Sequence, residues 1–166
     1  AYLPPNVSEY LLHAGKLLCE IYASFLSGQF LEAVILGGLM WLAFTLFGLP
    51  YAGLVAVLTG LLSFIPYVGS FVSCAVGAFI IFMISPVKAL ISIIVFQVVQ
   101  FIENQFIYPR VVGGAVGLSA LWTLIAVLIG GKLFGIIGMI FFIPLAATAY
   151  TLLGQAANKR LGNINK

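Results

Sequence analysis

Polar side chains recur at helical spacing within an otherwise apolar stretch, residues 87–108. The set consists of Ser92, Gln97, Gln100, Glu103 and Asn104. At about 100° of rotation per residue, they fall within an arc of about 140° on one helix face. Polar groups in lipid are costly, so this stripe is expected to face a bundle interior or a water-filled path. Within it, the Glu103 carboxyl group can bind a proton or a cation, which predicts a coupling residue for transport.

The same stripe also has a structural interpretation. The amides would then join helices by hydrogen bonds, and Glu103 would lie at the membrane edge near Pro109. Arg110 either pairs with Glu103 or marks the cytoplasmic interface. Glu32 is a secondary acidic candidate; it is weaker evidence for a site, because a carboxylate in the first turn of a helix is favoured by the helix dipole and can reach the interface. The residues expected to line a transport path are Gln97, Gln100, Glu103, Asn104 and Arg110.

The composition identifies the solvent of this protein as lipid. Hydrophobic residues make up 63% of the chain and charged residues 7%, with a mean hydropathy of +1.23, whereas soluble domains carry about 25% charged residues. The net charge of +3 comes without a basic stripe, so nucleic acid is not an expected partner. Cys19 and Cys74 form no C-x-x-C pair and predict no metal site. With no Asp, and His13 far from any buried nucleophile, the sequence predicts neither an enzyme nor a cofactor.

Apolar stretches long enough to cross about 30 Å of hydrocarbon must position these residues. We expect an all-α fold: a polytopic transmembrane helical bundle with short or re-entrant broken helices, preceded by an amphipathic helix. The amphipathic segment is expected at residues 1–27, the transmembrane bundle of about five to six membrane segments at 28–154, and a basic cytoplasmic tail at 155–166. The expected apolar helices are Gln29–Phe47, Tyr51–Phe64, Val68–Ile84, Val87–Tyr108, Leu118–Ile129 and Leu133–Leu153.

Two of these stretches, Tyr51–Phe64 and Leu118–Gly131, are short for a crossing. They are either half-helices that expose backbone groups to a polar cavity, or ordinary spans whose ends lie elsewhere. A hinge is expected at Gly130–Gly131, and an unusual backbone angle at Gly69. The recurring small residues also allow close helix packing without any gate. The expected helix breaks and gate residues are Pro66, Gly69, Pro109, Gly113, Gly117, Gly130, Gly131, Gly135 and Gly138.

Ordered motifs add a resemblance to a family. The motifs are Ile65-Pro66-Tyr67-Val68-Gly69, Gln100-Phe101-Ile102-Glu103-Asn104, Pro109-Arg110-Val111-Val112-Gly113, Val116-Gly117-Leu118 and Gly130-Gly131-Lys132-Leu133-Phe134-Gly135-Ile136-Ile137-Gly138 followed by Pro144. Together they resemble the autoinducer-2 exporter family, also called PerM-like permeases. The resemblance spans Gln29 to Leu153, the C-terminal half of a family member. One departure is Ser119-Ala120, where the family usually has His-Pro, so a role of that imidazole in proton handling does not carry over.

The resemblance implies a permease of the bacterial inner membrane that exports a small polar molecule such as autoinducer-2, or exchanges sodium or lithium for protons. It also implies a homo-oligomer, with a pentamer as one size. A non-transporting membrane scaffold stays open as another class of function. The basic residues Lys159, Arg160 and Lys166 favour a cytoplasmic C-terminus. Because the chain begins at Ala1 in an amphipathic stretch, we expect it to be part of a longer protein.

Overall fold

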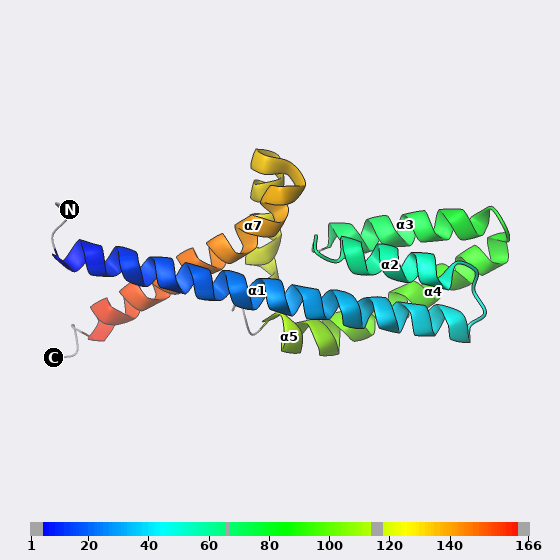
Figure 1. The fold of residues 1–166 in the computed structure, drawn as a ribbon, viewed down its shortest axis with the longest axis horizontal. Coiled ribbons are helices and arrows are strands. Elements are labelled where there is room, and N and C mark those ends of the chain that lie inside the picture. The colour runs from blue at the N-terminus through cyan, green and yellow to red at the C-terminus, as the bar shows by residue number, and fades with distance from the viewer. Residues whose placement is uncertain (1–4, 66, 114–117, 163–166) are drawn as a thin grey trace. The chain divides into compact units, whose positions relative to one another are not determined.

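The computed structural model describes residues 5–65, 67–113 and 118–162. The described residues form helices joined by turns and include no strand. This confirms the expected all-α class. In chain order the elements are α1 (Pro5–Leu46), α2 (Ala52–Leu62), α3 (Val68–Phe82), α4 (Pro86–Ile102), the π-helical turn η1 (Glu103–Ile107), α5 (Tyr108–Val111) and α7 (Ala120–Gly162), as Figure 1 shows.

The described helices have the length and the surface of membrane helices. The stretches Leu11–Leu46, Pro86–Val111 and Leu121–Gln155 are each long and apolar enough to cross a bilayer, while α2 and α3 are apolar but shorter. Large apolar side chains face outward, and Phe71 and Met83 are 75% and 76% exposed. Water would not tolerate so continuous an apolar surface. Lipid therefore covers these helices, as the composition predicts.

Contacts divide the chain into two compact units, one formed by Ser27–Gly114 and the other by Ala1–Leu26 with Ala115–Lys166. The division crosses α1, which is one unbroken helix from Pro5 to Leu46. The amphipathic segment expected at residues 1–27 is therefore not a separate helix. A change of polarity along a sequence does not end a helix when no proline there removes a backbone hydrogen bond.

In the Ser27–Gly114 unit, α2 packs on α3 and α3 packs on α4. The helices α2 and α3 form an antiparallel hairpin. A Cβ atom on Gly77 would lie 3.2 Å from the Val55 side chain, and one on Gly69 would lie 1.8 Å from the Leu62 carbonyl oxygen. The chain thus uses small residues to bring the two arms into backbone contact, a common device of membrane packing.

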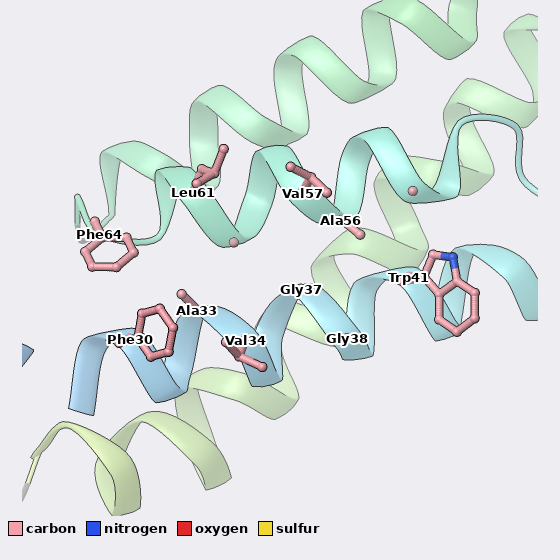
Figure 2. A pocket seen from close by; sticks show the side chains of 12 residues that line it. Phe30, Ala33, Val34, Gly37, Gly38, Trp41, Ala56, Val57, Leu61 and Phe64 are labelled. Carbon is pink, nitrogen blue, oxygen red and sulfur yellow. The ribbon is translucent and has the colours of Figure 1, made fainter. Parts of the chain in front are cut away.

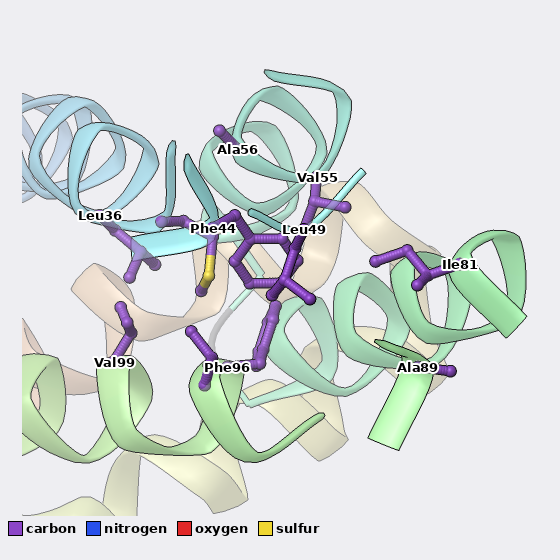
Figure 3. Close-up of a cluster of buried hydrophobic side chains, with 11 residues drawn as sticks. Leu36, Phe44, Leu49, Val55, Ala56, Ile81, Ala89, Phe96 and Val99 are labelled. Carbon is purple, nitrogen blue, oxygen red and sulfur yellow. The ribbon is translucent and has the colours of Figure 1, made fainter. Parts of the chain in front are cut away.

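A buried apolar cluster joins α1 to this hairpin and to α4 (Figure 3). Its largest fully buried members come from four helices. They are Leu36, Met40 and Phe44 of α1, Val55 of α2, Ile81 of α3 and Phe96 of α4. In lipid, van der Waals contact rather than removal of apolar surface from water stabilises such packing. The cluster fixes the helices between which the polar residues described below lie.

The α2–α3 turn differs from the expectation that placed its unusual backbone angle at Gly69. The positive φ of 65° belongs to Tyr67, the residue before α3. Gly69 is helical, and its lack of a side chain is needed for the approach of the Leu62 carbonyl oxygen. Pro66, an expected helix break, lies outside the described residues.

The helical path that begins with α4 also continues, through η1 and α5, past its expected end at Pro109. The Tyr108 backbone N–H donates to the Glu103 carbonyl oxygen, five residues back, which makes η1 a π-helical turn. Pro109 then lies in the first turn of α5, where a missing N–H is tolerated. The wider turn accommodates the proline, so the helical path runs from Pro86 to Val111.

Helix α7 reverses its direction at Gly135, and the hinge expected at Gly130–Gly131 is not found there. Gly135 has a φ of 64° and a ψ of −143°, which no helical residue adopts. A Cβ atom on Gly130 would lie 2.2 Å from the Gly138 carbonyl oxygen, although eight residues of straight helix span about 12 Å. The chain therefore folds back at Gly135 as a helical hairpin, and Gly130 is a packing position between its arms.

The first half of α1 packs on the second arm of this hairpin. The Tyr22 hydroxyl donates to the Phe141 carbonyl oxygen at 2.6 Å, and the two rings lie 5.8 Å apart. His13 Nε2 lies 3.4 Å from Gln155 Oε1. The second arm is helical through Gly162, so the first part of the expected tail at 155–166 continues α7.

Candidate functional site

Buried polar side chains meet inside the Ser27–Gly114 unit. We call them the polar cluster, and its members are Gln29, Glu32, Ser63, Ser70, Gln100 and Glu103. They come from α1, the end of α2, the first turn of α3 and the junction of α4 with η1. Four separate helical ends or faces therefore contribute to one site.

On the α1 side, Gln29 organises the polar cluster. Its amide Nε2 donates to Glu32 Oε2 at 2.8 Å and to the Ser63 carbonyl oxygen at 3.1 Å. Gln29 is 1% exposed and Glu32 is 3% exposed. The Ser63 carbonyl is free to accept because it lies at the end of α2, where carbonyl groups have no partner further along the helix. Because α2 ends here, the Ser63 carbonyl group is available to accept a hydrogen bond from Gln29 of α1.

On the α4 side, Ser70 and Gln100 connect α3 to α4. The Ser70 hydroxyl donates to Gln100 Oε1 at 3.2 Å, and Asn104 Nδ2 donates to the Gln100 backbone carbonyl at 2.8 Å. Glu103 is 3% exposed and is the first residue of η1. The π-helical turn that accommodates Pro109 therefore starts at Glu103, one of the two acidic residues of the site.

The two carboxyl groups are close enough to interact electrostatically. Tyr108 also interacts with both of them and with Tyr67. Within the described residues, no basic side chain pairs with Glu32 or Glu103. Arg110 is exposed and donates to the Phe106 carbonyl oxygen. The polar cluster thus contains two acidic groups without a compensating cation from the described chain.

Three buried atoms of the polar cluster have no hydrogen-bond partner within the described part of the chain: Gln29 Oε1, Gln100 Nε2 and Glu103 Oε1. Each such group costs about 1–3 kcal/mol when it is left unpaired. Native proteins keep few of them, and most of those bind water, an ion or a ligand. Two acceptors and one donor are therefore available to a species that enters this site.

The polar cluster lies deep in the apolar part of its unit. Its residues on α1 and α4 are about four to five helical turns, or about 21 to 26 Å, from Leu46 at the end of α1 and from Pro86 at the start of α4. Both of these ends lie on the same side of the unit (Figure 1). The α2–α3 hairpin therefore runs from that side of the unit to the polar cluster, which its turn contacts through Ser63 and Ser70.

The other residues that the sequence singled out for the polar stripe, the path or the helix breaks have different positions. Ser92 is buried and donates to the Ala89 carbonyl oxygen, while Gln97 and Asn104 are exposed. Gly113 is half-buried, and Gly117 lies outside the described residues. The expected gate residues of α7 belong to the other unit. The structure thus brings together Gln100, Glu103 and Glu32 of the expected site residues, and these are the ones that share the polar cluster.

Sequence reasoning missed Gln29, Ser63 and Ser70 as site residues. Gln29 precedes Glu32 by one helical turn, so an (i, i+3) amide–carboxylate pair in an apolar stretch is a signal that points to it. Ser63 and Ser70 flank the α2–α3 turn. Their proximity to α1 and α4 depends on helix packing, which no local pattern reports.

An apolar groove of about 470 Å³ also lies between α1 and α2 (Figure 2). Phe30 and Trp41 border it, and Gly37, Ala56 and Gly60 lie along it. A Cβ atom on Gly60 would lie 2.9 Å from the Ala33 carbonyl oxygen, so the two helices touch there. The groove offers almost no polar group and is not a site for a polar solute.

The fold and the polar cluster define a class: a helical membrane protein that encloses acidic and amide groups among apolar helices, the arrangement found along ion and solute pathways. A family described as "AI-2E family transporter" matches residues 1–158. The chain belongs to this family, which confirms the resemblance of the sequence motifs. It is thus a membrane protein of a transporter family.

Curated relatives agree with this assignment. The "Putative transport protein YueF" of Bacillus subtilis is 35% identical over 146 residues, which cover 87% of this chain and 39% of the relative. The "Putative transport protein YrrI" of the same organism is 35% identical over 130 residues, 78% of this chain and 36% of the relative. The chain thus spans well under half the length of these relatives. No solved structure matches it.

Proposed function

We propose that the protein is a permease that moves a small polar molecule across the membrane past the polar cluster. The observation that carries this proposal is the set of three unpartnered buried polar atoms, Gln29 Oε1, Gln100 Nε2 and Glu103 Oε1. In lipid, such atoms are expensive unless they serve a passing solute or water. Glu103 is the coupling residue of this proposal, and Gln100 holds the solute.

The proposed solute is autoinducer-2 or a similar small polar signal, and the proposed direction is export. This choice rests on the family description and on the resemblance of the motifs. A hydroxylated solute can both donate to the two unpartnered oxygens and accept from Gln100 Nε2. The proposed location is the inner membrane of a bacterium, with the C-terminus in the cytoplasm.

A second candidate function is exchange of sodium or lithium for protons. The observation that favours it is the pair of buried acidic residues, Glu32 and Glu103, which no basic side chain of the described residues compensates. A monovalent cation prefers carboxylate and carbonyl oxygens and would supply the missing charge. Here the cation would take the place that the first proposal gives to the solute.

Assembly into a homo-oligomer is part of the proposal, and a pentamer is one form it can take. Gln97 supports it, because this amide is exposed on a helix whose neighbouring side chains, Ile94 and Val98, are exposed and apolar. An amide that faces lipid is costly, whereas an amide between helices of two copies can be hydrogen-bonded. Asn104 is exposed on the same helical path but already donates to Gln100.

Flux in proteoliposomes tests these candidates. The intact protein is reconstituted, and transport of autoinducer-2 and of sodium is measured in the same vesicles with and without a proton gradient. We expect proton-linked flux of one of the two, and its loss in Glu103→Gln. The matched control is Glu20→Gln, which removes an exposed carboxyl group of α1.

Each outcome separates the candidates. Proton-linked sodium flux without autoinducer-2 flux would select the antiporter. No flux of either, with a Glu103→Gln protein that fails to assemble, would select a scaffold in which the polar residues only join subunits.

A further inference from the structure

Two buried acidic residues from distant parts of the sequence lie in one site. Glu32 of α1 and Glu103 of η1 are each 3% exposed, and their carboxyl groups interact electrostatically. Glu32 Oε2 accepts from Gln29, whereas Glu103 Oε1 has no donor. The two groups therefore differ in how well a negative charge on them is stabilised.

Among the residues that the structure describes, no group that faces the pair carries a positive charge. The other polar and titratable groups around it, from every element that contributes to the site, are Gln29, Ser63, Tyr67, Ser70, Gln100 and Tyr108. All of these side chains are neutral as amides, hydroxyls or phenols. Arg110 is exposed and donates to a backbone carbonyl. Two bare carboxylates would then repel each other at positions that are each only 3% exposed, where burial also disfavours the charged form.

A single proton on the pair would relieve this repulsion between the two carboxylates. A proton on Glu103 turns its carboxyl group from an acceptor into a donor. The remaining charge stays on Glu32, which Gln29 Nε2 already stabilises. A single proton therefore lowers the charge of the pair to one and leaves that charge on the carboxylate that already accepts a hydrogen bond.

We propose that Glu32 and Glu103 act as one proton-binding unit, which holds a single proton at neutral pH and releases it when a polar solute or a cation enters the polar cluster. Release breaks the O–H bond of the carboxylic acid, leaves a carboxylate that binds the incoming species, and passes the proton to water. This inference deepens the proposed function, on which it rests for the identity of the entering species, by giving the coupling to two residues instead of to Glu103 alone.

Infrared spectroscopy of the intact protein in lipid nanodiscs tests the unit directly. The carbonyl stretch of protonated carboxylic acid is followed across pH in the parent, in Glu32→Gln, in Glu103→Gln and in the double variant. Difference spectra against the double variant isolate the pair. We expect the parent to retain one protonated carboxyl group at neutral pH and to titrate in two separate steps, because interacting groups lose their protons one after the other.

The single variants decide whether the groups are coupled. Each should titrate in one step, and the sum of the two single titrations should fail to reproduce the parent. A sum that reproduces the parent, or a parent without protonated acid at neutral pH, overturns the inference. Glu20→Gln is the control and should leave the difference spectrum unchanged. If a single variant does not fold, the parent titration still decides, since one merged step contradicts the unit.

This test is separate from that of the permease. A coupled pair in a protein without solute or sodium flux would keep the proton-binding unit and overturn the proposed function. Flux with independent carboxyl groups would keep the permease and overturn the unit.

Discussion

The α2–α3 hairpin and the α7 hairpin both use glycine to bring their arms together, but their turns lie in different surroundings. In the α2–α3 hairpin, Gly69 lets the Leu62 carbonyl oxygen approach, and in the α7 hairpin, Gly130 and Gly138 let each other's carbonyls approach. The turn of the first hairpin lies beside buried amides and acids. The bend of the second is surrounded by exposed apolar side chains, which are Leu133, Phe134, Ile136 and Ile137.

The difference separates the residues that determine how closely two helices pack from the residues that could bind a solute or a proton. Glycine determines how closely two arms approach, and it does so equally well in both hairpins. Only the first hairpin ends against polar side chains of long helices, through Ser63 and Ser70. We therefore expect a broken helix to serve transport here only where its end meets polar partners.

Gly69→Ala should have the largest effect, because it breaks the first hairpin. The new Cβ atom would lie 1.8 Å from the Leu62 carbonyl oxygen, which is backbone and cannot rotate away. We expect a loss of about 3 kcal/mol in unfolding free energy, at the upper end for overpacking, together with loss of flux. Denaturation of the purified protein in mixed micelles measures the first, and vesicle flux the second.

Gly53→Ala is the control for this substitution. Gly53 lies in α2 of the same hairpin, and no atom lies within 4 Å of its added Cβ. Replacement by a better helix former should leave stability equal or slightly higher. Equal behaviour of the two variants would contradict the close approach at Gly69.

Gly135→Ala should have the next largest effect, because it strains the bend of the second hairpin. No atom lies within 4 Å of the added Cβ, so the cost comes from the positive φ of 64° alone. We expect a loss of about 2 kcal/mol in stability, within the range for such backbone strain. Gly154→Ala, in the same α7 with an open Cβ position, should be neutral.

The comparison predicts that Gly135→Ala leaves flux per folded molecule unchanged, because no polar cluster residue lies in α7. Slower flux per folded molecule would instead give this hairpin the gate role that its glycines first indicated. Thermal unfolding and flux on the same preparation separate the two results.

The sequence predicted the helical membrane class and some of the helix ends at which proline or a capping residue interrupts the backbone. Ser85 and Pro86, for example, start α4, with Ser85 Oγ accepting from the Lys88 backbone N–H. It failed at Pro109, since a π-helical turn can absorb a proline, and at Gly130, since a packing glycine and a bending glycine look alike in sequence. The contact of Gly130 with Gly138 depends on how the chain folds back, which local sequence does not report.

For the site, the sequence identified Glu103 and Gln100 from their common helix face, and Glu32 as an isolated acid. It could not join Glu32 to Glu103, because helix packing alone brings these parts of the chain together. It also placed Gln97 with them, although that side chain is exposed in the structure. A polar stripe that covers a wide arc of a helix can include both residues that pack against neighbouring helices and residues on the exposed side.

Gln100→Leu tests whether the polar cluster is kept for function. Gln100 Nε2 is buried without a partner, so an apolar side chain of similar size should raise stability by about 1 kcal/mol, less the lost bond from Ser70. Flux should fall by about tenfold, which corresponds to about 1.4 kcal/mol. Unfolding and flux measured together show whether the two move in opposite directions.

The matched control is Thr148→Val in the second hairpin. Thr148 is also buried, but its hydroxyl donates to the Pro144 carbonyl oxygen at 2.8 Å. Its replacement should leave flux unchanged, because this hydroxyl is already satisfied within its own helix. A Gln100→Leu protein with full flux would mean that the polar cluster is structural, like Thr148.

Gln97→Leu should have the smallest effect on folding. It tests whether the exposed amide of α4, unlike the buried amide of Gln100, contributes to contacts between subunits. Its side chain is exposed on α4 among apolar neighbours, so the change should alter the stability of one subunit by less than about 0.5 kcal/mol. An intermolecular hydrogen bond of this amide would contribute about 0.6 kcal/mol per contact in a membrane, repeated at every subunit interface. We therefore expect a shift toward smaller assemblies in native mass spectrometry, while Gln100→Leu, whose side chain is buried within its own unit, leaves assembly size unchanged. An unchanged assembly in Gln97→Leu would remove this amide from the subunit interface and leave it facing lipid.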